Sequence, residues 1–198
     1  MKIIGITGGV GAGKSELLKF IEMHYNCRII RADEAAHEIE QPGQACYHKL
    51  VTLLGTDILN ADKTIDKAKM AEKIFQSHTL LLEVNQLIHP AVKRYICDCI
   101  HEEQTKDTID YFFIEAALLI EEGYDLIVDE MWYIHTDAEI RSQRLQESRH
   151  YTSEKAESIM KQQLSEEEFR SHCQVEITNN GDLEDTYRQI KNALGVRK

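Results

Sequence analysis

Apolar and polar positions alternate along the chain in a way that predicts short strands separated by helices. Residues 2–7 are mostly apolar and run into glycines, as a buried strand does before a turn. Residues 15–25 carry apolar side chains every three to four positions, the spacing of one helix face. Residues 28–31 form a second short apolar run, and a helix is expected from about residue 34. Further strands are expected at residues 109–114, 126–135 and 175–178, with a terminal helix after the last.

The middle of the chain, from about residue 43 to residue 104, is helical in pattern. Its longest periodic stretch, residues 79–100, contains His89-Pro90. Because proline lacks an N–H group and its ring crowds the preceding turn, a kink or break is expected there. Two apolar helix faces are expected earlier, one formed by Leu50, Leu53 and Leu54 and one by Met70, Ile74 and Phe75.

Strands that alternate with helices predict an α/β fold, a parallel sheet covered by helices on both faces. No low-complexity segment, repeat or Gly/Ser linker divides the chain, so one compact unit is the simplest interpretation. The helical insertion between the second and third strands is expected to form a lobe over the carboxyl edge of the sheet. Open α/β sheets bind their ligands at that edge.

Composition narrows the class of protein. The net charge of −11 argues against a nucleic-acid groove, which needs a basic stripe. No apolar run is long enough to span a bilayer, and the N-terminus lacks the pattern of a signal peptide, so a cytoplasmic protein is expected. The five cysteines match no zinc or disulfide framework and are expected to be reduced thiols.

The strongest signal is Gly8-x-x-x-x-Gly13-Lys14-Ser15, which follows the first strand and opens the first helix. It matches the P-loop pattern, in which glycines let backbone N–H groups and a helix N-terminus surround phosphates. The lysine reaches the β- and γ-phosphates, and the serine hydroxyl ligates Mg²⁺. The predicted nucleotide-binding residues are Gly9, Val10, Gly11, Ala12, Gly13, Lys14 and Ser15.

Two carboxylates follow strands at the same edge. Asp33 comes just after the second strand, where a kinase base would accept the proton of an attacking hydroxyl. An N-cap of the next helix is an equally good interpretation of that position. Glu115 closes the third strand, where an acid commonly holds Mg²⁺ or its water, although a solvent-facing strand end explains it as well.

A basic cluster stands on and after the helix that follows the fourth strand. Arg141, Arg144 and Arg149 are candidates for a lid that closes over a transferring phosphate. The plainer interpretation is an exposed helix face on which Glu139 and Glu147 neutralise the arginines. On position alone the plainer interpretation is slightly favoured.

Beyond the P-loop, several motifs make the chain resemble the dephospho-coenzyme A kinase family nearly from end to end. The P-loop occurs in many kinases, whereas the combination of Ala-Asp, His-Pro and Asn-Asn-Gly at these separations is much more specific. The matching segments are Ile4 to Ser15, Ala32-Asp33, Ala36-His37, Pro42-Gly43, Gly55, Asp66-Lys67, Ile74-Phe75, Ile88-His89-Pro90, Ala117 to Glu121, Arg144-Leu145, Gln163 and Ile177 to Gly181.

The resemblance implies a P-loop kinase fold with five parallel strands and transfer of the ATP γ-phosphate to the 3′-hydroxyl of dephospho-coenzyme A. It implies Mg²⁺ as cofactor, a core of about residues 1–40 and 106–198, a helical acceptor lobe of about 41–105 and a lid of about 141–165. Asp33 matches the catalytic base, with Lys14 and Arg144 at the phosphates and Asn180 near the adenine. His89 and Pro90 are expected to shape the acceptor lobe, and Asp33 and His37 are expected to bind the acceptor with them. A monomer or weak homo-oligomer is expected.

The chain also departs from the family pattern. Ala117 stands where a proline is usual, and Glu115 where aspartate is frequent. Ser148-Arg149 replace an arginine-aspartate pair of the lid, and Ile159 replaces a further arginine. Either Arg141 and Arg149 substitute from shifted positions, or the lid is weak. A cation at the transferring phosphoryl group is worth roughly 10³-fold or more in rate, so the departure is expected to affect turnover more than ATP binding.

Two alternatives stay open from the residues. One is another small-molecule kinase, acting on a nucleoside monophosphate or a sugar. The other is a nucleotide-binding protein that has lost catalysis, as the missing lid arginines would allow. A GTPase is less favoured, because no guanine-binding Asn-Lys-x-Asp motif occurs.

Overall fold

A computed structural model describes residues 1–195, which form two compact units. The first unit comprises Met1–Ile29 and the chain from Asp107 onward, and the second comprises Ile30–Lys106. The resemblance divides the chain near residues 40 and 105 into a core and an acceptor lobe, and this division stays a prediction.

The predicted α/β fold with five parallel strands is confirmed. The strand order is β2-β3-β1-β4-β5, and the β1–β3, β1–β4 and β4–β5 pairs are parallel. In β1 every residue after Lys2 is buried, as expected of a strand covered on both faces. The strands are β1 (Lys2–Thr7), β2 (Cys27–Arg31), β3 (Tyr111–Glu115), β4 (Glu130–His135) and β5 (Val175–Thr178).

The register of the sheet brings the end of β3 to the start of the P-loop. Ile6 of β1 lies opposite Glu115 of β3, so the carboxylate stands beside the point where β1 ends. The predicted strand at residues 126–135 begins only at Glu130, because Tyr124–Leu126 form a short 3₁₀ helix that turns the chain before β4.

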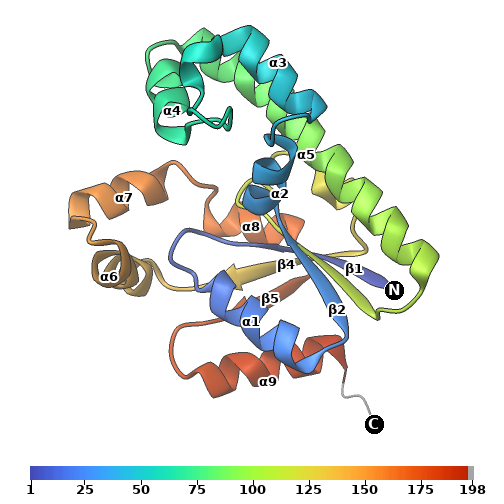
Figure 1. Cartoon of the computed structure of the whole chain (residues 1–198). Coiled ribbons are helices and arrows are strands. Elements are labelled where there is room, and N and C mark those ends of the chain that lie inside the picture. The colour runs from blue at the N-terminus through green and yellow to red at the C-terminus, as the bar shows by residue number, and fades with distance from the viewer. Residues whose placement is uncertain (196–198) are drawn as a thin grey trace. The chain divides into compact units, whose positions relative to one another are not determined.

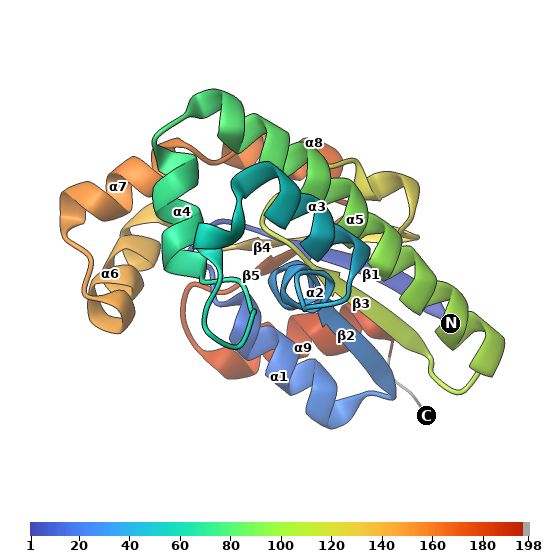
Figure 2. The ribbon, with the colours of Figure 1, turned by 45° about the horizontal axis from the view of Figure 1, so that its top comes forward.

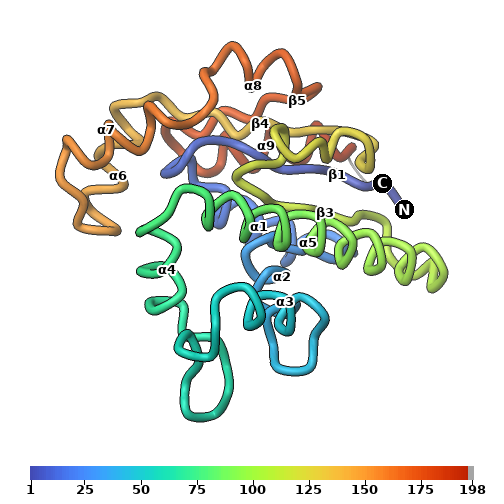
Figure 3. The backbone as a smooth tube through the Cα atoms, turned by 90° about the horizontal axis from the view of Figure 1, so that it is seen from above, coloured from blue at the N-terminus to red at the C-terminus, as the bar shows by residue number. Residues whose placement is uncertain are grey.

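Helices of the first unit cover the sheet and continue past its end (Figure 1). Helices α1 and α9 lie side by side in Figures 1 and 2, and the rings of Phe20 and Tyr187 stack between them with centroids 4.0 Å apart. On α8, Phe169 stacks on Tyr133 of β4 at 4.8 Å. The tube in Figure 3 shows α6 and α7 as neighbours at one end of this unit. The bounds are α1 (Lys14–His24), α6 (Ala138–Arg149), α7 (Ser153–Lys161), α8 (Glu166–His172) and α9 (Leu183–Leu194).

The second unit is helical. Helix α5 forms its spine, α2 and α3 pack on it, and α3 runs along it in Figures 1 and 2. The buried face of α5 includes Val84, Val92 and Ile96. The helices are α2 (Ala32–Ile39), α3 (Ala45–Leu54), the 3₁₀ turn Thr56–Ile58, α4 (Lys67–Phe75) and α5 (His78–Lys106).

A helix break at His89-Pro90 is wrong, because α5 continues through Pro90. A proline inside a helix costs about 3 kcal/mol. Pro90 itself is exposed, so water can bond the carbonyl that its missing N–H leaves unpaired. Burial of Val84 and Val92 on either side of it offsets the cost.

The apolar face expected from Met70, Ile74 and Phe75 is not a buried face. No residue of α4 is buried, and Phe75 is 94% exposed. By contrast, Leu50 and Leu54 of α3 are fully buried as their spacing predicted, and Leu53 is partly buried. All five cysteines are free in the structure. Within residues 1–195 no helix combines the length and the apolar character that crossing a membrane requires.

An ion pair fastens α8 to β5 and should make stability depend on pH. Arg170 donates to Glu176 at 2.9 Å and 3.1 Å, and this bond, more than the nearby charges of Arg170 and His135, lowers the pKa of Glu176 below its ordinary 4.5. Such a group stabilises the fold above its unfolded pKa, and the contribution is lost as pH falls through the folded pKa. The free energy of unfolding should therefore decline from pH 6 to pH 3 less steeply in Glu176→Gln than in wild type.

Urea unfolding at several pH values measures this effect. Glu167→Gln is the matched control, since Glu167 is an exposed acid of the same region. Equal acid sensitivity of wild type and Glu176→Gln would show that the pair contributes nothing.

Candidate phosphate-binding site

The P-loop folds as its sequence predicts. It leaves β1 after Thr7 and enters α1 at Lys14, and a hydrogen bond from Ala12 N to Gly9 O of 3.1 Å closes a turn within it. Within the described chain, the backbone N–H groups of Gly11, Gly13 and Ser15 have no hydrogen-bond partner. Donors at a helix N-terminus that the protein does not satisfy form a ready site for an anion.

Side chains from other elements lie close against two glycines of the loop. A Cβ at Gly9 would overlap the guanidinium of Arg141. Gly13 has φ +86°, the left-handed region that favours glycine, and a Cβ there would overlap the Asn179 amide. The loop therefore closely approaches side chains that arrive from α6 and from the end of β5.

Lys14 and Glu115, both predicted site residues, lie together. The Lys14 ammonium donates to Gly8 O at 2.7 Å and stands 3.8 Å from a carboxylate oxygen of Glu115. Both side chains are largely buried, which strengthens their attraction relative to a surface pair. Ser15 is exposed in the first turn of α1, as a hydroxyl that ligates a cation should be.

Arg141 is part of the loop's support, and its assignment to an exposed helix face is wrong. It is 9% exposed, and its Nε donates to Val10 O at 2.9 Å. The reason lies in helix geometry, because Arg141 and the buried Leu145 are four residues apart on one face of α6. Glu147, its expected surface partner, accepts instead from Gln143 at 2.9 Å.

The guanidinium of Arg141 remains charged despite its burial. Desolvation lowers its pKa, and the nearby Tyr133 and Glu166 oppose this shift. Arginine starts from so high a pKa that it stays protonated in proteins. A fixed cation therefore lies against Gly9 and Val10, at the end of the loop far from α1.

Arg144 lies at the other end of the loop. Its Nη2 donates to Asn179 O at 3.0 Å. Its Nη1 is buried and makes no hydrogen bond to any residue of the described chain. A Cβ at Gly13 would stand 3.5 Å from this atom. An unsatisfied buried guanidinium N–H is costly unless a ligand accepts from it, so Arg144 fits an anionic or acceptor-bearing ligand.

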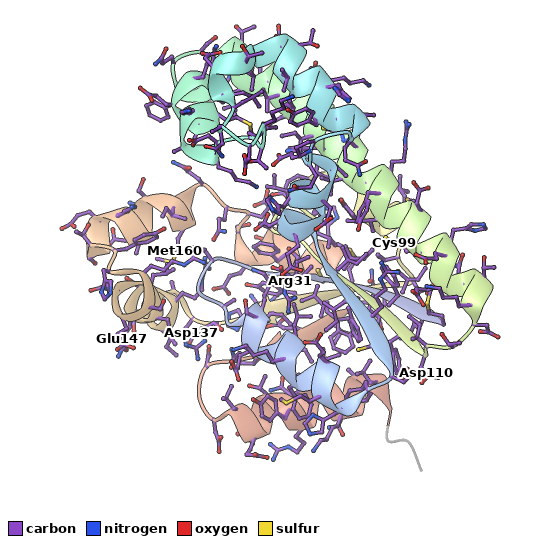
Figure 4. The ribbon with its side chains drawn as sticks, in the orientation of Figure 1. Arg31, Cys99, Asp110, Asp137, Glu147 and Met160 are labelled. Carbon is purple, nitrogen blue, oxygen red and sulfur yellow. The ribbon has the colours of Figure 1, made fainter. Side chains whose placement is uncertain are left out.

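Arg149 is placed differently from the other two arginines. It lies exposed in the last turn of α6, and no hydrogen bond or ion pair joins it to the P-loop in residues 1–195. Figure 4 labels Asp137, where the chain enters α6, and Glu147 farther along that helix. The structure thus gathers Arg141 and Arg144 at the loop and leaves Arg149 at the surface.

Sequence reasoning missed Asn179 and Thr136. Asn179 is 2% exposed, and its amide donates to Ala12 O at 2.8 Å while its carbonyl oxygen accepts from Thr186 at 3.2 Å. The Thr136 hydroxyl lies 3.2 Å from Ala12 O and 3.1 Å from Asn179 O. The Asn-Asn-Gly motif includes Asn179, but the prediction drawn from that motif named only Asn180.

Asn180 has a more peripheral role in the described contacts. Its side-chain oxygen accepts from the backbone N–H of Asp137 at 2.8 Å and so ties the end of β5 to the start of α6. This bond orders the loop that the resemblance places near the adenine.

The remaining predicted residues belong to the second unit. Asp33 is exposed in the first turn of α2, whose N-cap is Arg31, so the interpretation of Asp33 as the N-cap is wrong. His37, one turn later, has its Nε2 3.1 Å from the Gln41 amide. His89 and Pro90 lie within α5.

Comparisons of this chain with known proteins point to one enzyme family. The family model for dephospho-CoA kinase matches residues 2–185. A dephospho-CoA kinase of Streptococcus agalactiae serotype III (strain NEM316) is 34% identical over 193 residues, which are 98% of this chain and 97% of that protein. Two solved structures each cover 98% of this chain and 96% of their own: TT1252 from Thermus thermophilus, with 25% identity and a TM-score of 0.78, and a dephospho-CoA kinase from Campylobacter jejuni, with 20% identity and a TM-score of 0.72.

Proposed function

This chain belongs to the dephospho-CoA kinase family, and we propose that it transfers the γ-phosphoryl group of ATP to the 3′-hydroxyl of dephospho-CoA, giving CoA and ADP. One observation carries the proposal within this chain. The glycine loop presents backbone N–H groups that have no partner in the described chain. The unsatisfied Nη1 of Arg144 and the ammonium of Lys14 lie at the same loop. A triphosphate tail supplies the oxygens that such donors need.

Each end of the loop has a distinct task. The N–H groups of Gly11, Gly13 and Ser15 hold the phosphates next to the N-terminus of α1. Lys14 lies 2.7 Å from Gly8 O and turns from this carbonyl toward the β- and γ-phosphates. Arg144 donates its unsatisfied N–H on the side of Gly13, and Arg141 supplies a fixed cation beside Gly9 and Val10.

Glu115 at the end of β3 and Ser15 in the first turn of α1 fit a magnesium ion. Mg²⁺ prefers oxygen ligands and in kinases takes one or two from the protein, the rest coming from water and phosphate. The Ser15 hydroxyl and the Glu115 carboxylate are such ligands, and no cluster of three or more His, Cys, Asp and Glu occurs in the described residues to compete as a metal site. When bound, the ion neutralises charge on the β- and γ-phosphates.

Asp33 is the proposed base. Its position just past the carboxyl end of β2, its exposure and its freedom from an N-cap role all suit a carboxylate that accepts the proton of the 3′-hydroxyl. The acceptor-binding region is proposed to extend over the second unit to His37, His89 and Pro90, since α2 packs on α5 within that unit. The protein is proposed to act in the cytoplasm as a monomer or weak homo-oligomer, with neither nucleic acid nor membrane as a partner.

A coupled assay of ADP formation tests the function. With purified protein, ATP, Mg²⁺ and dephospho-CoA, ADP should form in amounts equal to the CoA produced, and chelation of Mg²⁺ should stop the reaction. A panel of nucleoside monophosphates and sugars in place of dephospho-CoA separates this activity from that of another small-molecule kinase. ATP binding without consumption in the presence of dephospho-CoA would favour a nucleotide-binding protein without catalysis.

A further inference from the structure

The side chain of Gln163 enters the P-loop from a distant part of the chain. Gln163 follows α7, where its own N–H donates to Met160 O at 3.2 Å. Its side-chain oxygen accepts from the backbone N–H of Val10 at 3.1 Å and from Nη2 of Arg141 at 2.6 Å. In Figure 4, Met160 marks α7, the helix that leads to this residue.

The arrangement of the two donors is that of an anion site. A loop amide and a guanidinium converge on a single oxygen, as they do on an oxygen of a bound phosphate. The acceptor in place is a neutral carboxamide, which satisfies both donors without contributing charge. Val10 N–H donates to one acceptor at a time, so a phosphate oxygen and Gln163 compete for it.

The position of Val10 indicates which phosphate competes. Phosphates nearest the N-terminus of α1 meet Gly13 and Ser15. Val10 lies four residues before the first residue of α1, at the end of the loop that Arg141 covers. Because the loop amides next to the helix cradle the α- and β-phosphates, the terminal phosphate of a bound triphosphate is the one that reaches this end.

We propose that the Gln163 oxygen occupies the subsite of the terminal phosphate of ATP and must be displaced when ATP binds. The inference rests on the proposed function of the loop as an ATP site. Gln163 is thus a specificity-determining residue that lowers the affinity for the triphosphate and leaves that for the diphosphate unchanged. Its displacement also releases the link between α7 and the P-loop.

Nucleotide affinities of Gln163 variants test the proposal. Calorimetry with Mg²⁺-ATP and Mg²⁺-ADP should show that Gln163→Leu binds ATP about fivefold to tenfold more tightly, because one competing hydrogen-bonded contact is gone. Its affinity for ADP should stay within about twofold of wild type. Gln162→Ala is the matched control, since Gln162 is exposed and precedes Gln163.

A second variant gives the opposite sign. Gln163→Glu places a carboxylate on Arg141 and should weaken ATP binding more than ADP binding, since like charges repel at the terminal phosphate. If Gln163 merely supports the loop, both variants weaken ATP and ADP equally, and the proposal is overturned. Equal affinities in wild type and both variants overturn it as well. Failure of the wild type to bind ATP contradicts the proposed function instead, whereas normal turnover with unresponsive Gln163 variants contradicts only this inference.

Discussion

Asp33→Asn is expected to lower turnover by about 10³-fold while the affinity for ATP stays within about twofold of wild type. Asparagine keeps the size of the side chain but cannot accept the proton of the 3′-hydroxyl. Asp33 makes no N-cap bond in α2, so the substitution removes no backbone hydrogen bond that the structure shows. Turnover in the ADP assay and ATP binding by calorimetry measure the two quantities separately.

The neighbouring acid provides the control for Asp33. Glu34→Gln removes an exposed carboxylate from the same turn of α2, where it lies 3.4 Å from Arg31, and should change turnover less than about threefold. Near-normal turnover of Asp33→Asn would remove Asp33 from the role of base. A comparable loss in both variants would indicate that the acidic turn acts through its total charge.

Arg141→Ala is expected to lower kcat/KM for ATP about 10²- to 10³-fold, whereas Arg149→Ala should change it less than about twofold. The two residues share α6 but differ in burial and in contact with the loop. Removing Arg141 takes a desolvated cation from the Gly9–Val10 end of the loop, where the terminal phosphate is proposed to lie. It also leaves Val10 O without its donor. Charge stabilisation is strong where water is excluded.

Arg141→Lys separates charge from loop support. Lysine keeps a cation but cannot donate from Nε to Val10 O and from Nη2 to Gln163 with the same planar geometry. Activity closer to wild type than that of Arg141→Ala would assign the larger part of the effect to charge. Thermal unfolding of each variant reports damage to the fold independently. A larger loss in Arg149→Ala than in Arg141→Ala would instead make Arg149 the lid cation.

These expectations derive from two kinds of information. The P-loop and its flanking strand and helix are local, since Thr7 to Ser15 are contiguous and the glycines announce the turn. The strand pattern likewise predicted a parallel sheet, because buried parallel strands are continuously apolar. The expected helix break at Pro90 and the expected buried face at Phe75 are both wrong, because tertiary burial, or its absence, overrides local preference.

The surroundings of the loop could not be predicted in the same way. Gln163 and Asn179 meet it from more than 150 residues away in the chain. Both carry uncharged amides, which sequence patterns alone do not distinguish from surface residues. Arg141 stood in a polar helix whose periodicity did not tell which face would be buried.

From the order of its residues alone, this chain is a P-loop α/β protein with a lysine and a serine at the phosphates and a carboxylate after its second strand. Those features depend on neighbouring positions, and local backbone geometry enforces them. Which arginine reaches the loop, and which amide fills its end, was decided only when α6 and the segment after α7 packed against it. Such contacts join residues that lie far apart in the chain, which no short stretch of sequence encodes.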